Sequence, residues 1–218
     1  MNYDGLIEQF MQHFTSEAYR GEVKLGRAEF HKMAGVFDEE SPDFEEKMSQ
    51  FVDWYLFARP LSETGRTPVE EAHAQPKNLP FAVDSAVLQK LVDNRPSLFE
   101  FIKLKGSDLS IKDMFSGYKY TVKDSPLVVG LEKNVVFSAR LIPIEDGVVF
   151  SGAFCFHPIQ ANKFIRAEVK AVQKLPLEQQ KTAREKLLAK LFSMRHKFDQ
   201  YRHVEVKDIY SNDSRVRL

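Results

Sequence analysis

Apolar side chains recur at helical spacing near the start of the chain. Between residues 3 and 15 they lie three and four positions apart, at Leu6, Ile7, Phe10, Met11 and Phe14. This period is typical of a helix that buries one face. The pattern therefore predicts an amphipathic helix over this segment.

A second helix is predicted to begin at Ser41 and Pro42 and to end before Pro60. Serine is a favoured N-cap residue, and proline is well tolerated in the first helical turn. Acidic residues follow in the first turns, where the helix dipole favours negative charge. One side of this helix is apolar, at Phe44, Met48, Phe51, Val52, Tyr55 and Leu56.

Two shorter helices are predicted farther along. Thr67 and Glu70 have the spacing of a capping box, in which each residue satisfies the backbone amide of the other. The next helix runs from about residue 84 to residue 92 and ends before Pro96. Residues 75–80 contain two prolines and are predicted to be a connector.

The hydrophobic pattern becomes alternating near Leu98, and aromatic and β-branched residues are frequent up to about His157. This change predicts β-strands. Asp146-Gly147 is a strong hairpin turn signal. Its register gives one apolar face, with Leu141 opposite Gly152, Ala139 opposite Phe154 and Phe137 opposite Phe156.

A second hairpin turn is predicted at Ser116-Gly117. It would place Phe115 opposite Tyr118, Asp113 opposite Tyr120, Ile111 opposite Val122 and Leu109 opposite Asp124.

Helical spacing returns after Pro158. One segment carries Ile165, Val169 and Val172, and Pro176 interrupts the pattern. A longer segment then carries Leu187, Leu188, Leu191, Phe192, Phe198 and Tyr201. We expect an antiparallel helical hairpin or one kinked helix, followed by a frayed tail from Tyr210 to Leu218.

These elements predict an α+β protein with three regions. Residues 1–95 form an acidic helical N-terminal part, and residues 96–158 form a small antiparallel β barrel or curved sheet. Residues 159–218 form a basic helical hairpin with a tail.

The charge of the 218-residue chain is balanced in total and uneven in distribution. Its 31 basic and 31 acidic side chains cancel, yet residues 1–100 carry 10 basic and 18 acidic side chains, and residues 159–218 carry 14 and 7. Such asymmetry can indicate a partner. In one interpretation, the basic C-terminal helices dock on the acidic N-terminal third of the same chain or of a second copy.

In the other interpretation, the basic helices face an external polyanion such as nucleic acid, with binding that weakens steeply as salt is added. The candidate residues are Lys163, Arg166, Lys170, Lys174, Lys181, Arg184, Lys186 and Lys190.

Cys155 is the only cysteine, which excludes an intramolecular disulfide and a multi-cysteine zinc site. The sequence has no secretion-signal pattern and no run of about 18 apolar residues, so we expect a cytoplasmic protein that does not enter a membrane. It has no phosphate-binding glycine loop, nucleophile elbow or zincin motif. We therefore expect no metal, no cofactor and no catalytic residue.

Four side chains with useful chemistry are predicted to share the second face of the Asp146-Gly147 hairpin: Ser138, Arg140, Cys155 and His157. A thiol, an imidazole and a guanidinium are components of nucleophilic and anion-binding sites. Cys155 and His157 are two apart on one strand, an arrangement that seldom forms the hydrogen bond needed to activate a thiolate. The alternatives are a ligand or anion site around Arg140 and His157, or a half-buried face covered by a helix.

The Ser116-Gly117 hairpin offers two further candidates. Asp113 is the one charge on its apolar face, so it is either a general acid or base or an acceptor for backbone amides or for Tyr120. The opposite face carries Lys112, Lys119 and Lys123. Basic residues on a small sheet are typical of some nucleic-acid-binding proteins, but the aromatic residues that would stack on bases lie on the other face.

Two stretches of the chain have a pattern in common with other sequences. The first is Phe51-Val-Asp-Trp54-Tyr-Leu-Phe57-Ala-Arg59-Pro-Leu61, followed by Gly65-Arg-Thr67-Pro68. The second comprises residues 113–122, residues 139–143 and Ser151-Gly152. Together they resemble a family of uncharacterised bacterial proteins with an F-x-D-W-[FY]-x-F helix-loop and a small β domain. Some members end in a cysteine-rich SEC-C zinc knuckle, which this chain lacks. The resemblance implies an architecture and no known activity.

These observations favour a non-catalytic binding or adaptor protein, with a protein partner or self-association. One alternative is an enzyme with a site at the junction of the sheet and the helices, around Arg140 and His157. The other is a nucleic-acid-associated protein that uses the basic C-terminal helices.

Overall fold

The computed structural model describes residues 3–36, 39–40, 44–125, 127 and 132–213, and these divide into two units. Unit 1 comprises Met1–His31, Phe37–Arg95 and Arg140–Ala153. Unit 2 comprises Lys32–Val36, Pro96–Ala139 and Phe154–Leu218.

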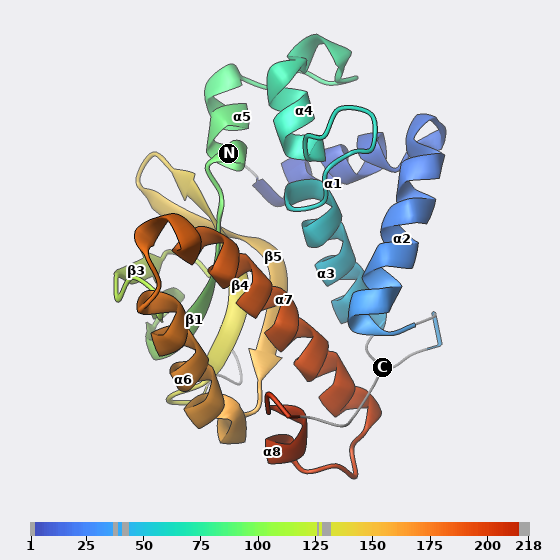
Figure 1. Cartoon of the computed structure of the whole chain (residues 1–218). Coiled ribbons are helices and arrows are strands. Elements are labelled where there is room, and N and C mark those ends of the chain that lie inside the picture. The colour runs from blue at the N-terminus through green and yellow to red at the C-terminus, as the bar shows by residue number, and fades with distance from the viewer. Residues whose placement is uncertain (1–2, 37–38, 41–43, 126, 128–131, 214–218) are drawn as a thin grey trace. The chain divides into compact units, whose positions relative to one another are not determined.

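Unit 1 is built from helices and the turn end of one β hairpin (Figure 1). Its helices are α1 (Tyr3–Phe14), α2 (Arg20–Ala34), α3 (Phe44–Phe57), α4 (Pro68–Ala74) and α5 (Ser85–Val92). Short 3-10 helices span Glu17–Tyr19 and Pro76–Asn78. The helical prediction for the first third of the chain is confirmed, although α2 was not predicted as a separate helix.

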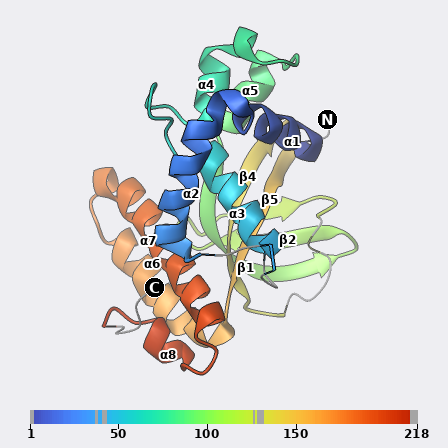
Figure 2. The same ribbon diagram turned by 90° about the vertical axis from the view of Figure 1, so that its right-hand side faces the viewer.

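Helices α2 and α3 lie side by side in both views (Figures 1 and 2). The rings of Phe30 and Phe51 meet edge to face, with centroids 5.4 Å apart. A Cβ atom at Gly26 would lie 3.1 Å from the Tyr55 ring, so glycine at this position lets the two helices approach closely. The aromatic residues of the helix-loop stretch therefore build the core of unit 1.

Side chains cap the starts of helices α4 and α5 in unit 1. Thr67 and Glu70 form a complete capping box at the start of α4. Asp84 caps α5 by accepting a hydrogen bond from the backbone amide of Ala86. Helix α3 ends at Phe57, before Pro60 as predicted. The N-cap prediction for Ser41 and Pro42 lies outside the described residues.

The strands are β1 (Arg95–Lys105), β2 (Asp108–Asp113), β3 (Lys119–Val122), β4 (Val136–Ile144) and β5 (Gly147–His157). They form an antiparallel sheet in the order β3-β2-β1-β4-β5. The sheet is open, so the barrel alternative was wrong. Closure would require β3 to pair with β5, and β3 has only four residues in which to do so.

The predicted register of the Ser116-Gly117 hairpin was also wrong, by two residues. Leu109 pairs with Val122 and Ile111 with Tyr120. The backbone amide of Asp113 donates to the carbonyl of Tyr118 at 2.9 Å, so the four residues 114–117 form the loop between this bonded pair. A shift of two positions keeps each side chain on its predicted face.

The helices of unit 2 are α6 (Asn162–Gln173), α7 (Leu177–Gln200) and α8 (Val206–Ile209), and a 3-10 helix at Ile159–Ala161 precedes them. Helices α6 and α7 form the predicted hairpin and lie side by side (Figures 1 and 2). Their apolar side chains form a core with residues of the sheet and of α8: Leu98, Val136, Ile165, Val169, Leu187, Leu191, Met194, Ile209 and Tyr210.

The prediction of a frayed tail from Tyr210 onward was wrong for Tyr210 itself. Its side chain is only 3% exposed and belongs to the core of unit 2. The short helix α8 places it there, and four residues are too few to give a visible hydrophobic period in the sequence. Residues 214–218 lie outside the described part of the chain.

Candidate functional site

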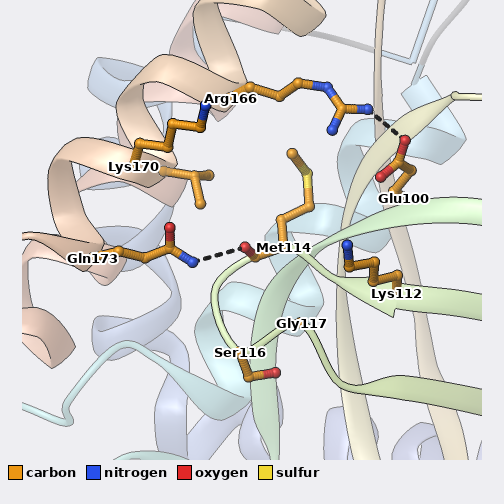
Figure 3. Close-up of a pocket in the computed structure, with 9 residues that line it drawn as sticks. Glu100, Lys112, Met114, Ser116, Gly117, Arg166, Lys170 and Gln173 are labelled. Carbon is orange, nitrogen blue, oxygen red and sulfur yellow. Dashed lines mark hydrogen bonds and ion pairs between the residues drawn. The ribbon is translucent and has the colours of Figure 1, made fainter.

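A groove in unit 2 lies between helix α6 and strands β1 and β2 (Figure 3). It has a volume of about 340 Å³. The lining residues are Glu100, Lys112, Met114, Ser116, Gly117, Arg166, Val169, Lys170 and Gln173. They combine charged side chains with the apolar Met114 and Val169, so the groove offers a ligand both kinds of contact.

One wall of the groove is the loop between β2 and β3, and hydrogen bonds hold this loop from two sides. The Oδ1 atom of Asp113 accepts hydrogen bonds from the amides of Phe115 and Ser116 at 2.8 and 2.9 Å. From α6, the Nε2 atom of Gln173 donates to the carbonyl of Phe115 at 2.7 Å. Gly117 has a φ of 74°, which favours glycine. Asp113 is thus an acceptor for backbone amides, and the wall is preformed.

The sheet contributes charges of both signs to the groove. Glu100 on β1 pairs directly with Lys112 on β2, and Lys112 pairs with Lys119 on β3. Residues directly opposite in an antiparallel pair share a face and have neighbouring Cβ atoms. The register therefore places Glu100 beside a cation on the groove face of the sheet.

Helix α6 supplies the other cations. Lys163, Arg166, Lys170 and Lys174 are three and four positions apart, a spacing that places them on one side of the helix. Arg166 and Lys170 line the groove, and Arg166 Nη2 donates to Glu100 Oε1. Lys112 and Lys170 form no ion pair within the described residues. The groove thus holds three cationic side chains and one carboxylate, an excess of two positive charges.

Two members of the predicted polyanion-binding set instead have partners inside unit 2. The guanidinium of Arg184 donates to the carbonyl of Pro96 at 3.3 Å and lies over the Phe115 ring. Lys190 Nζ lies 2.7 Å from Glu168 Oε2. These contacts hold α7 within unit 2, so the structure explains both residues without an external anion.

The other members of that set are exposed, at Lys163, Lys174, Lys181 and Lys186. Their binding of a polyanion stays a prediction. The groove residues Glu100, Met114 and Gln173 were missed because no short motif links them. The alternating pattern of β1 and the helical spacing of Gln173 with Lys170 were the available signals, and both require the packing of α6 beside the sheet.

Three of the four predicted ligand-binding residues lie in unit 2, on the sheet face that meets the helices. Cys155 and His157 are each 3% exposed. His157 Nε2 lies 3.1 Å from Ser138 Oγ, and His157 Nδ1 lies 3.0 Å from Tyr210 Oη. Burial, and then the positive charge of Arg195, lowers the pKa of His157 to about 3, so the imidazole is neutral at pH 7. This geometry favours the interpretation of a covered face.

Arg140, the fourth residue of that predicted set, belongs to unit 1 and has its own partners there. Its Nε and Nη2 atoms donate to Asp53 Oδ2 at 3.0 and 2.9 Å, and its Nη1 donates to Asn94 Oδ1 at 2.5 Å. Ser151 Oγ also donates to Asp53, at 2.5 Å. The guanidinium carbon lies 4.9 Å from the centroid of the Phe57 ring. Arg140 therefore joins the hairpin turn end to α3 and the segment after α5.

The described residues contain no group of three or more His, Cys, Asp and Glu side chains placed to hold a metal ion. Among the same residues, no helix has both the length and the apolar character needed to cross a bilayer.

The sequence was also compared with known proteins. Residues 5–205 match the model of a family of unknown function, DUF7986. The chain belongs to this family. This membership agrees with the resemblance, noted from the sequence, to a family of uncharacterised proteins. No curated protein matches the sequence. No solved structure matches it either.

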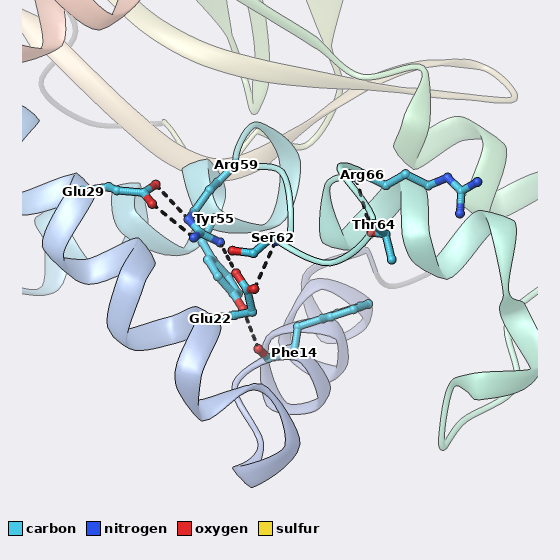
Figure 4. Close-up of polar contacts among 8 residues, drawn as sticks. All are labelled: Phe14, Glu22, Glu29, Tyr55, Arg59, Ser62, Thr64 and Arg66. Atoms are coloured by element: carbon cyan, nitrogen blue, oxygen red, sulfur yellow. Dashed lines mark hydrogen bonds and ion pairs between the residues drawn. The ribbon is translucent and has the colours of Figure 1, made fainter.

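In this DUF7986 protein, the helix-loop stretch positions Arg59 inside a polar network of unit 1 (Figure 4). Arg59 contacts Glu22 at 2.7 Å and Glu29 at 2.9 Å, and Glu22 also accepts from the amide of Ser62. Partial burial alone would raise the pKa of Glu22, but the hydrogen bonds from Arg59 and Ser62 outweigh it and lower that pKa. Burial raises the pKa of Tyr55 to about 12, and its hydroxyl donates to the carbonyl of Phe14. The network ties α1, α2 and α3 together.

Proposed function

We propose that this protein is a non-catalytic binding protein, an adaptor, whose groove beside α6 binds an acidic segment of a protein partner. The observation that carries the proposal is that one groove is lined by Lys112 from β2 and by Arg166 and Lys170 from α6. Basic residues from two segments that are far apart in the sequence thereby line the same groove.

The charge of the groove supports an anionic ligand. Lys112 and Lys170 are exposed, and each lacks an ion pair within the described residues. An excess of positive charge in a concave site attracts acidic groups and speeds their association.

The other lining residues support a polypeptide rather than a nucleic acid. Met114, which is half-buried, provides an apolar contact suited to a side chain that accompanies the acidic groups. No aromatic ring belongs to the lining set, whereas single-stranded nucleic acids are commonly bound by stacking on such rings.

The lining set also supports binding rather than catalysis. Ser116 is its only hydroxyl-bearing residue, and Ser116 Oγ accepts a hydrogen bond from the amide of Tyr118 at 3.2 Å. No histidine or cysteine lines the groove, so no imidazole there can activate this hydroxyl.

Fluorescence anisotropy with a labelled peptide of alternating Glu and Leu tests the proposal. We expect the full chain to bind this peptide, and a Gln-Leu peptide of the same length to bind at least about tenfold more weakly. The double variant Lys112→Glu with Lys170→Glu should lose about tenfold in affinity or more. Lys181→Glu with Lys186→Glu changes the net charge equally on exposed lysines outside the groove lining, and it should lose less than about twofold.

Single- and double-stranded DNA probes of matched length complete the experiment. The proposal predicts weaker binding of both than of the acidic peptide at the same salt concentration. DNA binding that is tighter than peptide binding, and that is lost in the Lys112→Glu and Lys170→Glu double variant, would support the nucleic-acid alternative instead. Equal losses in the two double variants would show that the groove is not the site.

A further inference from the structure

The groove contains a carboxylate of its own, on Glu100. Arg166 extends from α6 toward β1, and its Nη2 atom donates to Glu100 Oε1 next to Met114 (Figure 3). The Arg166 side chain is 45% exposed, whereas that of Glu100 is 17% exposed. The arginine is therefore accessible to a ligand, although it already has a carboxylate partner.

The strand register fixes Glu100 in this place. Glu100 pairs with Lys112 across the two strands, so its side chain lies between a sheet cation and a helix cation. A carboxylate between two cations takes the position that suits an acidic group of a ligand.

We infer that Glu100 is an internal competitor in the groove, and that a partner binds when one of its own Asp or Glu carboxylates takes Arg166 from Glu100. This inference rests on the proposed function, which it deepens by naming carboxylates as the ligand chemistry and Glu100 as the residue that limits affinity.

The exchange replaces one carboxylate on Arg166 with another, so the number of ion pairs is conserved. An ion pair between partly exposed side chains contributes little net free energy, and breaking it costs correspondingly little. The displaced Glu100 stays beside Lys112 on the sheet, where that cation offsets its charge. The partner gains Arg166 together with the free cation Lys170, and neither cation requires a rearrangement of the backbone.

The variant Glu100→Gln tests the inference, because it keeps the shape of the side chain and removes its charge. We expect its affinity for the Glu-Leu peptide to rise about fivefold or more, with a steeper loss of affinity as salt is added. Glu168→Gln is the matched control. It makes the same charge change on α6, at a carboxylate that pairs with Lys190 and does not line the groove. Its affinity should change less than about twofold.

Arg166→Gln separates competition from a purely structural role of the ion pair. Both variants break the same pair, but Arg166→Gln also removes a ligand-binding cation. Competition predicts opposite effects, with higher affinity in Glu100→Gln and lower affinity in Arg166→Gln. If the pair serves only to hold α6 against β1, both variants should lower affinity and both should unfold at lower urea concentration.

The outcomes distinguish this inference from the proposed function. If Glu100→Gln binds no better than the wild type while the Lys112→Glu and Lys170→Glu double variant still loses binding, the competitor role is wrong and the acidic-partner function stands. If neither the wild type nor Glu100→Gln binds the peptide, both are wrong. Binding by Glu100→Gln that clearly exceeds that of the wild type supports both.

Discussion

Arg140 and Asp53 form an ion pair in unit 1, with their charged groups 2.9 Å apart, although 87 positions separate them in the sequence. Their side chains are 7% and 16% exposed. The pair fastens the turn end of the β hairpin to helix α3, and Ser151 donates a further hydrogen bond to the same carboxylate.

We expect Asp53→Ala to destabilise unit 1 by about 3 kcal/mol, since it leaves the buried cation of Arg140 without its carboxylate. Arg140→Met should cost less, because it removes that charge and retains an unbranched apolar stem beside Phe57. Urea unfolding followed by the fluorescence of Trp54, which lies in unit 1, measures both. Ser151→Ala, with a loss of about 1 kcal/mol, is the neighbouring control. A loss in Asp53→Ala no greater than in Ser151→Ala would contradict the prediction.

The lowered pKa of the buried His157 imidazole predicts that unit 2 loses stability in acid. Its pKa is about 3 in the folded chain, against an ordinary value of 6.5. Below pH 6.5 the unfolded chain takes up a proton that the folded chain excludes until about pH 3, so the stability present above pH 6.5 is lost progressively as the pH falls. The loss should be about 2 kcal/mol between pH 6.5 and pH 5.

Urea unfolding by circular dichroism at several pH values measures this loss. His157→Gln should have a lower stability at pH 7 and a pH dependence smaller by about 2 kcal/mol over the same interval. His203→Gln removes an exposed histidine from the same unit and is the matched control. An unchanged pH dependence in His157→Gln would mean that another group is responsible.

The burial of α8 predicts that the last described helix stabilises unit 2. Ile209 is fully buried in the core of unit 2, so Ile209→Ala should lower the free energy of unfolding by about 3 kcal/mol. Tyr210→Phe should cost about 1 kcal/mol, because it leaves Nδ1 of His157 without its hydroxyl partner. Thermal unfolding by circular dichroism checks both, with the exposed Arg202→Ala as control. If Ile209→Ala were as stable as Arg202→Ala, α8 would not contribute to the core.

The capping box of α4 is expected to make a small contribution to the stability of unit 1, and that contribution should depend on the Thr67 hydroxyl. Thr67→Ala removes the oxygen that accepts from the amide of Glu70, and it should cost about 1 kcal/mol. Thr67→Ser keeps that oxygen and should remain within about 0.5 kcal/mol of the wild type. Trp54 fluorescence during urea unfolding gives both values. Equal losses in the two variants would indicate that the methyl group of Thr67, rather than the cap, is what matters.

The sequence predicted most successfully where the determining interactions are local. The capping box of Thr67 and Glu70 satisfies amides within three positions, so it can be predicted from neighbouring residues alone. The predicted register of the Ser116-Gly117 hairpin was wrong because Asp113 closes a longer loop with its own side chain. A turn dipeptide alone does not indicate such a side-chain cap.

The candidate site was harder to predict because its parts come from distant segments. The basic spacing of α6 was visible, and Lys112 was visible on the sheet, but only the packing of the helix beside β1 and β2 unites them. Arg140 illustrates the converse case. Its charge indicated a ligand site, while the structure supplies the internal partner Asp53 from 87 positions away.

The hairpin from Val136 to His157 determines how this chain can be divided. Its turn end, Arg140–Ala153, belongs to unit 1, while both of its flanking segments belong to unit 2. No single cut therefore yields either unit whole. A fragment that ends at residue 95 keeps Asp53 and loses Arg140, and a fragment that starts at residue 96 keeps the turn end without the helices that cover it. Neither unit is therefore one continuous stretch of the chain, and the family match over residues 5–205 includes segments of both.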